Sequence, residues 1–212
     1  SDVIILCVGE DRDMSGEACS RSSLDLPGVQ EELAKELLKT GKPVIVVLMN
    51  GRPLSINWLN ENANVILETW FAGTMAGDAI AKVLFGDYNP SGKLPVTFPR
   101  TVGQVPIYYN HKNTGRPGDK ENHYTSQYLD LPLTPLYPFG YGLSYTTFEY
   151  GNLNLSQNKI TAEDSIVVSV RIKNTGKFDG EEVVQLYIQD LVGSVTRPVK
   201  ELKGFKKIFL KR

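Results

Sequence analysis

The chain is poor in the residues that bind metals and form disulfides, since its 212 residues include only two cysteines and two histidines. Four such residues spread along the sequence do not form a zinc-binding spacing. A chain of this size needs no disulfide framework. Cys7 lies inside an apolar run and is expected to be a small core residue, whereas Cys19 lies in a loop. A bridge between the two is possible in principle.

Acyl-transfer chemistry has little support in the sequence. No G-x-S-x-G motif is present, and a Ser-His-Asp triad would have to draw on His111 or His123. Both histidines fall in an irregular segment, so the approach of one of them to Cys19, which a cysteine nucleophile would need, stays open.

Long hydrophobic runs and an excess of charge of one sign are also missing. The net charge is 23 − 24 = −1, and no basic stripe is present, so nucleic acid is not an expected partner. No apolar stretch approaches the ~20 residues that span a bilayer. No P-loop or G-x-G-x-x-G motif occurs, and no cofactor is expected. No signal peptide is visible. Because the chain opens directly on an apolar run, we expect its true amino terminus to be missing.

The first thirty residues contain a strand, a polar loop and the start of a helix. Val3 to Val8 is a short, continuous apolar run, typical of a strand buried on both faces. After Pro27, apolar residues recur at helical spacing until Gly41. The loop from Glu10 to Leu26 therefore lies at the carboxyl end of a strand, where open α/β sheets bind their ligands.

Strands and helices continue to alternate further along the chain. Pro43–Met49 and Asn64–Thr69 are predicted as two more strands, and a helix is predicted from Thr74 until Gly86. This alternation is typical of a parallel sheet with covering helices. The sequence therefore predicts an α/β first part.

From Phe85 onward the pattern changes. Pro99 to Pro138 is rich in Pro, Gly, Asn and Tyr without a clear period, as in a functional or wrapping segment. Short β runs follow at Ser165–Ile172, Glu182–Gln189 and Phe205–Leu210, separated by turn residues. Such runs favour an antiparallel, all-β sandwich in the last part of the chain.

Several blocks of the sequence resemble one enzyme family. The loop Gly16–Gln30 (GEACSRSSLDLPGVQ) is similar to the acid/base loop of glycoside hydrolase family 3, in its periplasmic β-glucosidase branch. Five further blocks follow in the family's order: Gly41–Leu54, Ile66–Arg100, Val105–Pro117, Leu136–Phe148 and Arg197–Ile208. Six matching blocks over nearly the whole chain are far more specific than any single motif.

The resemblance implies a division into three parts. Residues 1–107 would form an α/β sandwich domain that lacks its start, and 108–147 an irregular wrapping linker. Residues 148–212 would form a fibronectin type III-like domain, cut short because such folds need about seven strands. The resemblance also implies an upstream TIM-like barrel that supplies the nucleophilic aspartate and most sugar contacts. This segment alone is therefore expected to be inactive.

The same resemblance makes Glu17 the expected general acid/base of a retaining, exo-acting β-glucosidase that acts on β-glucoside oligosaccharides. Retaining glycosidases hold two carboxyl groups ~5–5.5 Å apart, one as nucleophile and one as proton donor. A glutamate on a loop of small residues can enter an apolar sugar site and serve as that donor. Without the resemblance, Glu17 would read as an exposed loop residue. Substrate-binding residues are not identified, and a periplasmic or secreted location is implied by the resemblance alone.

Other charged residues of the loop compete with Glu17. Glu10 is the strongest rival because it directly follows the strand, although it could instead hold the loop by bonding backbone amides or Arg12. Arg21 is expected to pair with a carboxylate and set the shape of the loop, because a cation touching the donor would disfavour its protonated form. The remaining acids of the loop are Asp11, Asp13 and Asp25.

Two alternative functions stay open. A β-xylosidase or arabinofuranosidase of the same family would share these residues, because the absent barrel largely sets sugar choice. A non-catalytic carbohydrate-binding or adhesion module could have the same layers but has no use for a proton donor. The aromatic residues between Tyr108 and Tyr145 could stack on sugars, although interdomain packing is the favoured interpretation. Asn154-Leu155-Ser156 fits a glycosylation acceptor.

Overall fold

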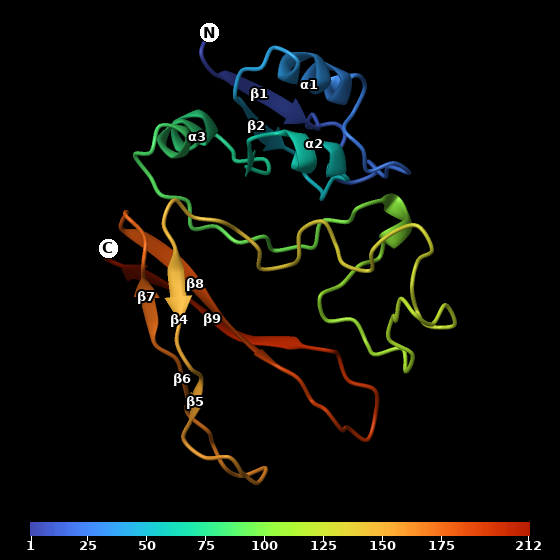
Figure 1. Cartoon of the computed structure of the whole chain (residues 1–212), viewed down its shortest axis with the longest axis vertical. Coiled ribbons are helices and arrows are strands. Elements are labelled where there is room, and N and C mark those ends of the chain that lie inside the picture. Colours follow the sequence, from blue (N-terminus) through green and yellow to red (C-terminus); the bar gives the residue numbers. More distant parts are fainter.

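The structure is a computed structural model that describes all 212 residues. Its first part contains a parallel sheet in the order β1-β2-β3 with three helices. The strands are β1 (Ile4–Gly9), β2 (Val44–Met49) and β3 (Val65–Glu68). The predicted helices are α1 (Gln30–Leu38) and α3 (Ala76–Leu84), and α2 (Asn57–Asn62) is an additional short helix between β2 and β3. Figure 1 shows β1 and β2 of this sheet beside the helices α1, α2 and α3. Because all three strands run the same way, their carboxyl ends meet at one edge of the sheet.

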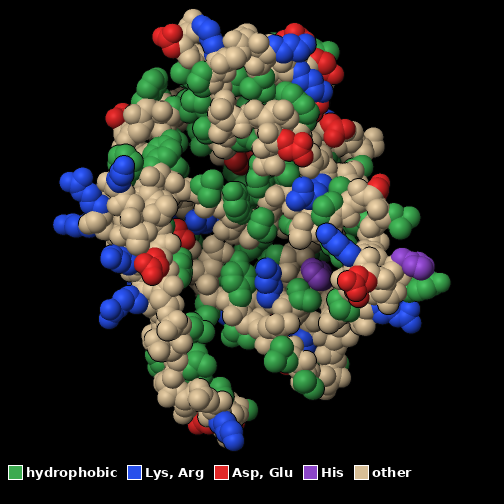
Figure 2. All heavy atoms as spheres, viewed as in Figure 1, with side chains coloured by type: hydrophobic (Ala, Val, Ile, Leu, Met, Phe, Trp, Pro, Cys, Tyr) green, Lys and Arg blue, Asp and Glu red, His purple; other side chains and the backbone are tan.

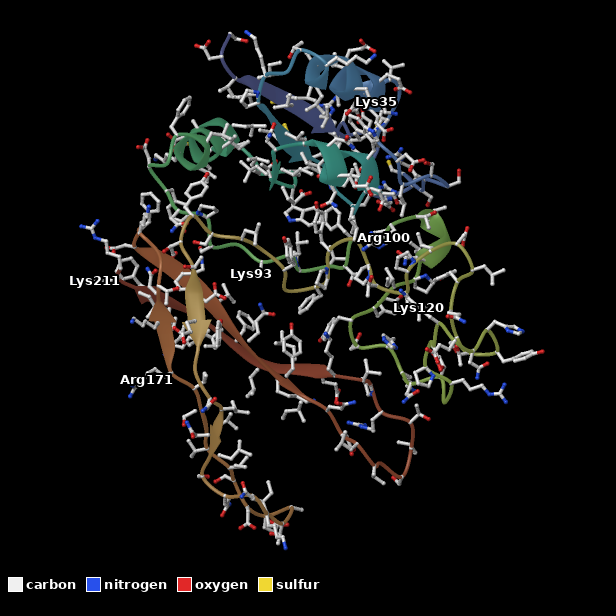
Figure 3. All side chains as sticks on the ribbon, in the orientation of Figure 1. Lys35, Lys93, Arg100, Lys120, Arg171 and Lys211 are labelled. Atoms are coloured by element: carbon white, nitrogen blue, oxygen red, sulfur yellow. The ribbon has the colours of Figure 1, made fainter.

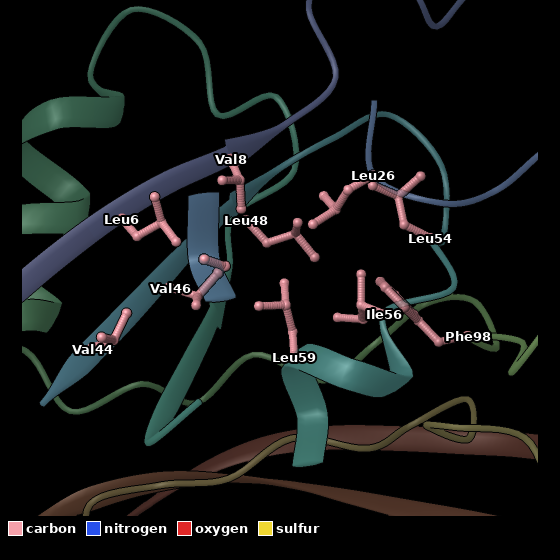
Figure 4. Close-up of a cluster of buried hydrophobic side chains, with 11 residues drawn as sticks. Leu6, Val8, Leu26, Val44, Val46, Leu48, Leu54, Ile56, Leu59 and Phe98 are labelled. Atoms are coloured by element: carbon pink, nitrogen blue, oxygen red, sulfur yellow. The ribbon is translucent and has the colours of Figure 1, made fainter. Parts of the chain in front are cut away.

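The hydrophobic core lies between one face of this sheet and the helices α1 and α2 (Figure 4). Alternate residues of β1 and β2 point into it, and the register places Leu6 beside Val46 and Val8 beside Leu48. Ala34 of α1 and Leu59 of α2 are fully buried against them. This core fixes the sheet edge from which the loop after β1 emerges.

The prediction that the first strand is buried on both faces is wrong. Ile5 is 48% exposed and Cys7 is exposed, so Cys7 is not a core residue. β1 lies at the edge of the sheet, and its second face is not covered within this chain. Only the central strand β2 is buried on both faces, as the fully buried Val46 and Val47 show.

Residues 85–147 are almost free of regular structure, as predicted, with one short helical turn, η1 (Val102–Gln104). The segment is nevertheless tied to the α/β part. Phe98 and Tyr137 form an antiparallel bridge, and the Phe98 ring contacts the rings of Trp70 and Tyr137 with centroids 5.7 and 5.9 Å away. Phe98 is 1% exposed, so the irregular stretch 85–147 supplies a core residue.

The last part of the chain consists of paired antiparallel strands. β4 (Phe148–Tyr150) pairs with β7 (Ile172–Asn174), β5 (Asn154–Leu155) with β6 (Val168–Ser169), and β8 (Gly180–Ile188) with β9 (Glu201–Leu210). The single strand predicted over 165–172 is instead broken into β6 and the start of β7, which pair with different strands. The predicted fold class, an α/β part followed by a fibronectin type III-like β part, is confirmed.

The segment after α3 connects the two parts through polar contacts. Figure 3 shows Lys93 between the parallel sheet of the first part and the strands β8 and β9. Its Nζ lies 3.2 Å from Oε2 of Glu182 in β8. The two side chains are only 15% and 11% exposed. Asn89 donates a 2.9 Å hydrogen bond to the main-chain oxygen of Asp179. On the face shown in Figure 2, charged side chains of both signs are scattered and form no basic stripe.

Candidate active site

The site begins where β1 ends, at Gly9. This residue has φ of +137°, and a Cβ there would lie 1.8 Å from the main-chain oxygen of Met49. The side-chain amide of Gln30 brackets Gly9: its oxygen accepts from Gly9 N at 2.7 Å, and its nitrogen donates to Gly9 O at 2.9 Å. The start of α1 is thereby tied to the end of β1, and the intervening residues form a closed loop.

Glu10 holds this loop from its buried side. It is 5% exposed, and its Oε1 lies 2.8 Å from Arg21 Nη1 and 2.9 Å from Arg52 Nε. Its Oε2 accepts a 3.2 Å hydrogen bond from Gly51 N. Glu10 thus satisfies both oxygens inside the protein, as a buried carboxylate must. The predicted anchoring role is present, but Arg12 is not the partner, because Arg12 pairs with Asp13 at the surface.

The two arginines extend the anchor into the loop itself. Arg21 Nη2 donates to the main-chain oxygen of Asp25 at 2.9 Å, so Arg21 shapes the loop as predicted. Arg52 Nη2 donates to the main-chain oxygens of Met14 and of Cys19, the second at 2.8 Å. Arg52 was not singled out from the sequence. It follows β2 by three residues, and the end of β2 lies beside the end of β1 in a parallel sheet.

Glu17 lies between these two anchored carbonyl groups, and its side chain is exposed. The backbone around it is unusual: Gly16 has φ of +138° and Ala18 has φ of +60°. The main-chain oxygen of Glu17 accepts a 3.3 Å hydrogen bond from Cys19 Sγ. No ion pair of the chain involves the Glu17 carboxylate, in contrast to Glu10. Glu17 therefore differs from Glu10 in both exposure and pairing.

A shallow hollow of about 330 Å³ opens in the same loop. The hollow is lined by Asp13, Met14, Cys19, Ser20, Arg21, Pro27 and Gly28.

The other acids of the loop, Asp11, Asp13 and Asp25, are exposed. Asp25 accepts a 2.8 Å hydrogen bond from Ser23.

Glu68 is a second unusual carboxyl at this edge of the sheet. Burial raises its pKa to about 7, although Trp70 N donates to its Oε1 at 2.8 Å. Its Oε2 is buried without a partner, and so is Oδ1 of Asn50 on the neighbouring strand end. Sequence reasoning missed both residues. Their position directly at the ends of β3 and β2 was the only available signal.

The remaining candidates do not gather into a site. His111 contacts the main-chain oxygen of Lys112, and the ring of His123 lies tilted against Tyr124 with centroids 4.0 Å apart. Cys19 Sγ donates to the main-chain oxygen of Glu17, and neither histidine contacts it. No group of three His, Cys, Asp or Glu side chains has a geometry that could hold a metal ion. No helix has the length and apolar character required to cross a membrane.

Several aromatic residues of the wrapping segment pack, as the sequence analysis favoured. Tyr109 stacks on Phe139 at 4.3 Å and meets Tyr187 of β8 at 5.9 Å, while Tyr137 stacks on Tyr141 at 5.3 Å. The outermost rings of the segment, Tyr108 and Tyr124, are instead 62% and 75% exposed.

Known proteins match this chain along its whole length. A periplasmic β-glucosidase of Salmonella typhimurium is 54% identical over 213 residues, and a β-xylosidase of Formosa agariphila is 54% identical over 211 residues. Each alignment covers 100% of this chain and 28% of the relative, so the chain spans little more than a quarter of their length. A crystal structure of a β-glucosidase from Listeria innocua in complex with glucose has a TM-score of 0.95 and 47% identity. That match covers 99% of this chain and 29% of the other.

Two family models match different parts of the chain. Residues 182–212 match a fibronectin type III-like domain, and residues 1–145 match the glycosyl hydrolase family 3 C-terminal domain. The second match alone covers more than half of the chain. The chain therefore belongs to glycosyl hydrolase family 3.

Proposed function

We propose that this chain is the carboxy-terminal part of a retaining, exo-acting β-glucosidase and that Glu17 is its general acid/base. An amino-terminal barrel domain supplies the nucleophile and most of the sugar site. Within this chain, residues 1–107 form the α/β domain, 108–147 the wrapping linker and 148–212 the fibronectin type III-like domain. The enzyme works in the periplasm or outside the cell, a location supported only by the name of the Salmonella relative.

The observation that carries this proposal is the contrast between the two glutamates of one loop. Glu10 is buried and bound to two arginines, so its carboxylate has no capacity left for proton transfer to a substrate. Glu17 projects from the same anchored loop with an unpaired, exposed carboxylate. A proton donor has to reach the glycosidic oxygen, and the exposed, unpaired carboxylate of Glu17 supports that role. The barrel would supply the apolar surroundings that such a donor requires.

In this mechanism Glu17 protonates the departing oxygen while the nucleophile of the barrel attacks the anomeric carbon. The resulting glycosyl-enzyme is then hydrolysed by a water molecule from which Glu17 removes a proton. Because only one of the two carboxylates lies in this chain, residues 1–212 by themselves are expected to be inactive on aryl β-glucosides.

A β-xylosidase is the second candidate, because the Formosa β-xylosidase is as similar to this chain, at 54% identity, as the Salmonella β-glucosidase. The two activities differ in whether a hydroxymethyl group is present on the sugar ring. Comparison of kcat/KM for aryl β-glucoside and aryl β-xyloside, with the full-length enzyme, distinguishes them.

The role of Glu17 is tested by Glu17→Ala in the full-length enzyme. The variant should lose ~10²–10⁴-fold in activity on cellobiose, the usual contribution of general acid–base catalysis. An activated aryl glucoside leaves without a proton, so it should still form the covalent intermediate. Added azide should then restore turnover and yield β-glucosyl azide.

Two matched variants complete the test. Asp13→Ala removes an exposed acid of the same loop and should leave activity within a fewfold of the parent. Glu10→Ala should lower activity without azide rescue, because it disturbs the loop alone. Azide rescue of Glu10→Ala, with none for Glu17→Ala, would show that the acid has been misassigned.

A further inference from the structure

We propose that Arg52 is a positioning residue for the acid/base loop, a role that rests on the proposed function of Glu17. One guanidinium group joins three parts of the site. Its Nε lies 2.9 Å from Glu10 Oε1, and its Nη2 donates to the main-chain oxygens of Met14 and Cys19. These two carbonyl groups stand on either side of Glu17, three residues before it and two after it.

Arg52 can hold the loop because it is itself fixed. Its side chain is 21% exposed and that of Glu10 is completely buried. The main-chain oxygen of Arg52 accepts a 2.7 Å hydrogen bond from Asn50 Nδ2, and Asn50 is fully buried at the end of β2. The adjacent Gly51 N donates to Glu10 Oε2. The guanidinium thus extends from the rigid edge of the sheet into the loop.

Arginine suits this task in a way that lysine does not. Its guanidinium presents five donors in a rigid plane, so Nη2 can bind both carbonyl groups in fixed directions while the charge pairs with Glu10. The contact of Nε with Glu10 is an ion pair without hydrogen-bond geometry. An ammonium group is a point charge on a flexible stem. Arg21 also binds Glu10, but its other contact is Asp25, eight residues beyond Glu17. Arg52 is therefore the side chain that fixes the backbone on both sides of Glu17.

The position of the loop matters for the chemistry. A general acid must lie within hydrogen-bond reach of the oxygen that it protonates, and a displacement of about 1 Å can cost about 10²-fold in rate. Loss of the Arg52 contacts should harm protonation of the leaving group more than attack by the nucleophile, which comes from another domain. The consequence is a loss of activity that depends on the leaving group.

The test uses the full-length enzyme and two substrates, cellobiose and 2,4-dinitrophenyl β-glucoside. Arg52→Lys should lower kcat/KM on cellobiose by about 10–10²-fold and on the activated glucoside by less than about threefold. Because kcat/KM reports events up to the first irreversible step, the comparison isolates departure of the leaving group. Arg12→Lys, a change at an exposed arginine of the same loop, should alter neither value.

Glu17→Ala and the double variant Glu17→Ala/Arg52→Lys decide whether Arg52 acts through Glu17. If it does, adding Arg52→Lys to Glu17→Ala should cause no further selective loss on cellobiose. Equal losses of Arg52→Lys on both substrates would reveal a merely structural role and overturn the proposal. The same comparison is made with Arg52→Gln if the lysine variant does not fold.

The failure of each proposal has its own signature. If Glu17→Ala discriminates between the substrates and neither Arg52 variant does, the Arg52 proposal falls and the role of Glu17 stands. If Glu17→Ala itself shows no dependence on the leaving group, the proposed role of Glu17 falls and that of Arg52 falls with it.

Discussion

Replacement of Glu68 by glutamine should remove a pH dependence of stability that this one carboxyl creates. Glu68 lies at the end of β3, where Trp70 N donates to its Oε1. Its Oε2 and the Oδ1 of Asn50 are both buried acceptors without a donor. A proton on Glu68 supplies one donor to this arrangement, and the amide of glutamine does the same at every pH. Glu68→Gln therefore mimics the protonated state permanently.

The sign and size of the effect follow from the pKa. Desolvation raises the pKa of Glu68 from 4.5 to about 7, so the folded protein binds more protons than the unfolded chain between these values. Stability contributed by the protonated group is fully present below pH 4.5 and is lost as the pH rises through 7. At about 1.4 kcal/mol for each pKa unit, the wild-type protein should lose up to about 3 kcal/mol across this window.

The assay compares the thermal midpoints of wild type and Glu68→Gln in the full-length protein at pH 5, 6, 7 and 8. The two proteins should have similar midpoints at pH 5, and the advantage of the variant should grow up to about pH 7 and then level off. Glu61→Gln, a change at an exposed glutamate of α2, should follow the wild type at every pH. A constant difference between Glu68→Gln and wild type would refute the reasoning, because it would show that Glu68 does not titrate in this range.

Two further substitutions test the packing around the site and between the parts of the chain. A Cβ at Gly51 would lie 2.1 Å from Ser15 Oγ, so Gly51→Ala should displace the loop. It should destabilise the fold by about 2 kcal/mol and lower activity on cellobiose. The control Gly77→Ala, where a Cβ would enter open space on α3, should change neither stability nor activity in this way. Unaffected activity in Gly51→Ala would contradict the tight contact. Glu182→Ala removes the carboxylate partner of Lys93, whose Nζ still donates a 2.7 Å hydrogen bond to the main-chain oxygen of Gly142, and should cost about 2 kcal/mol. The cost is measured as a lower unfolding midpoint that the double variant with Lys93→Met partly restores. An unchanged midpoint for the single variant would mean that the pair carries no stability.

The sequence was sufficient for the elements whose pattern is local. The parallel α/β layer is predicted by the apolar runs at the positions of β1, β2 and β3 and by the helical spacing in α3. These patterns are readable because buried residues of a helix or strand are apolar at regular intervals. The irregular character of residues 99–138 was equally readable. The short helix α2 was not predicted, since its six residues, Asn57–Asn62, show too little periodicity. The broken strand around residue 170 was missed because pairing partners, rather than propensity, decide where a short strand ends.

The exposure of Cys7 shows a second limit. An apolar run indicates that a strand is suited to burial but not where that strand lies in the sheet. β1 has β2 as its single neighbour, and its second face is open, so Ile5 and Cys7 reach the surface. That outcome depends on the strand order, which no local pattern contains.

For the candidate site, the location of the loop and its acid residues could be predicted from the sequence, because a polar loop after an apolar run is a local signal. It also predicted that Arg21 would bind a carboxylate. Which carboxylate is bound and which is free depends on how the strands assemble into the sheet. Glu10 meets Arg52, 42 residues later, because parallel strands bring their carboxyl ends to one edge of the sheet. Asn50 and Glu68 come to neighbouring strand ends at that edge for the same reason. Burial and charge pairing at that edge are properties of the assembled sheet. They distinguish Glu10, which is buried and bound by two arginines, from Glu17, which is exposed and unpaired.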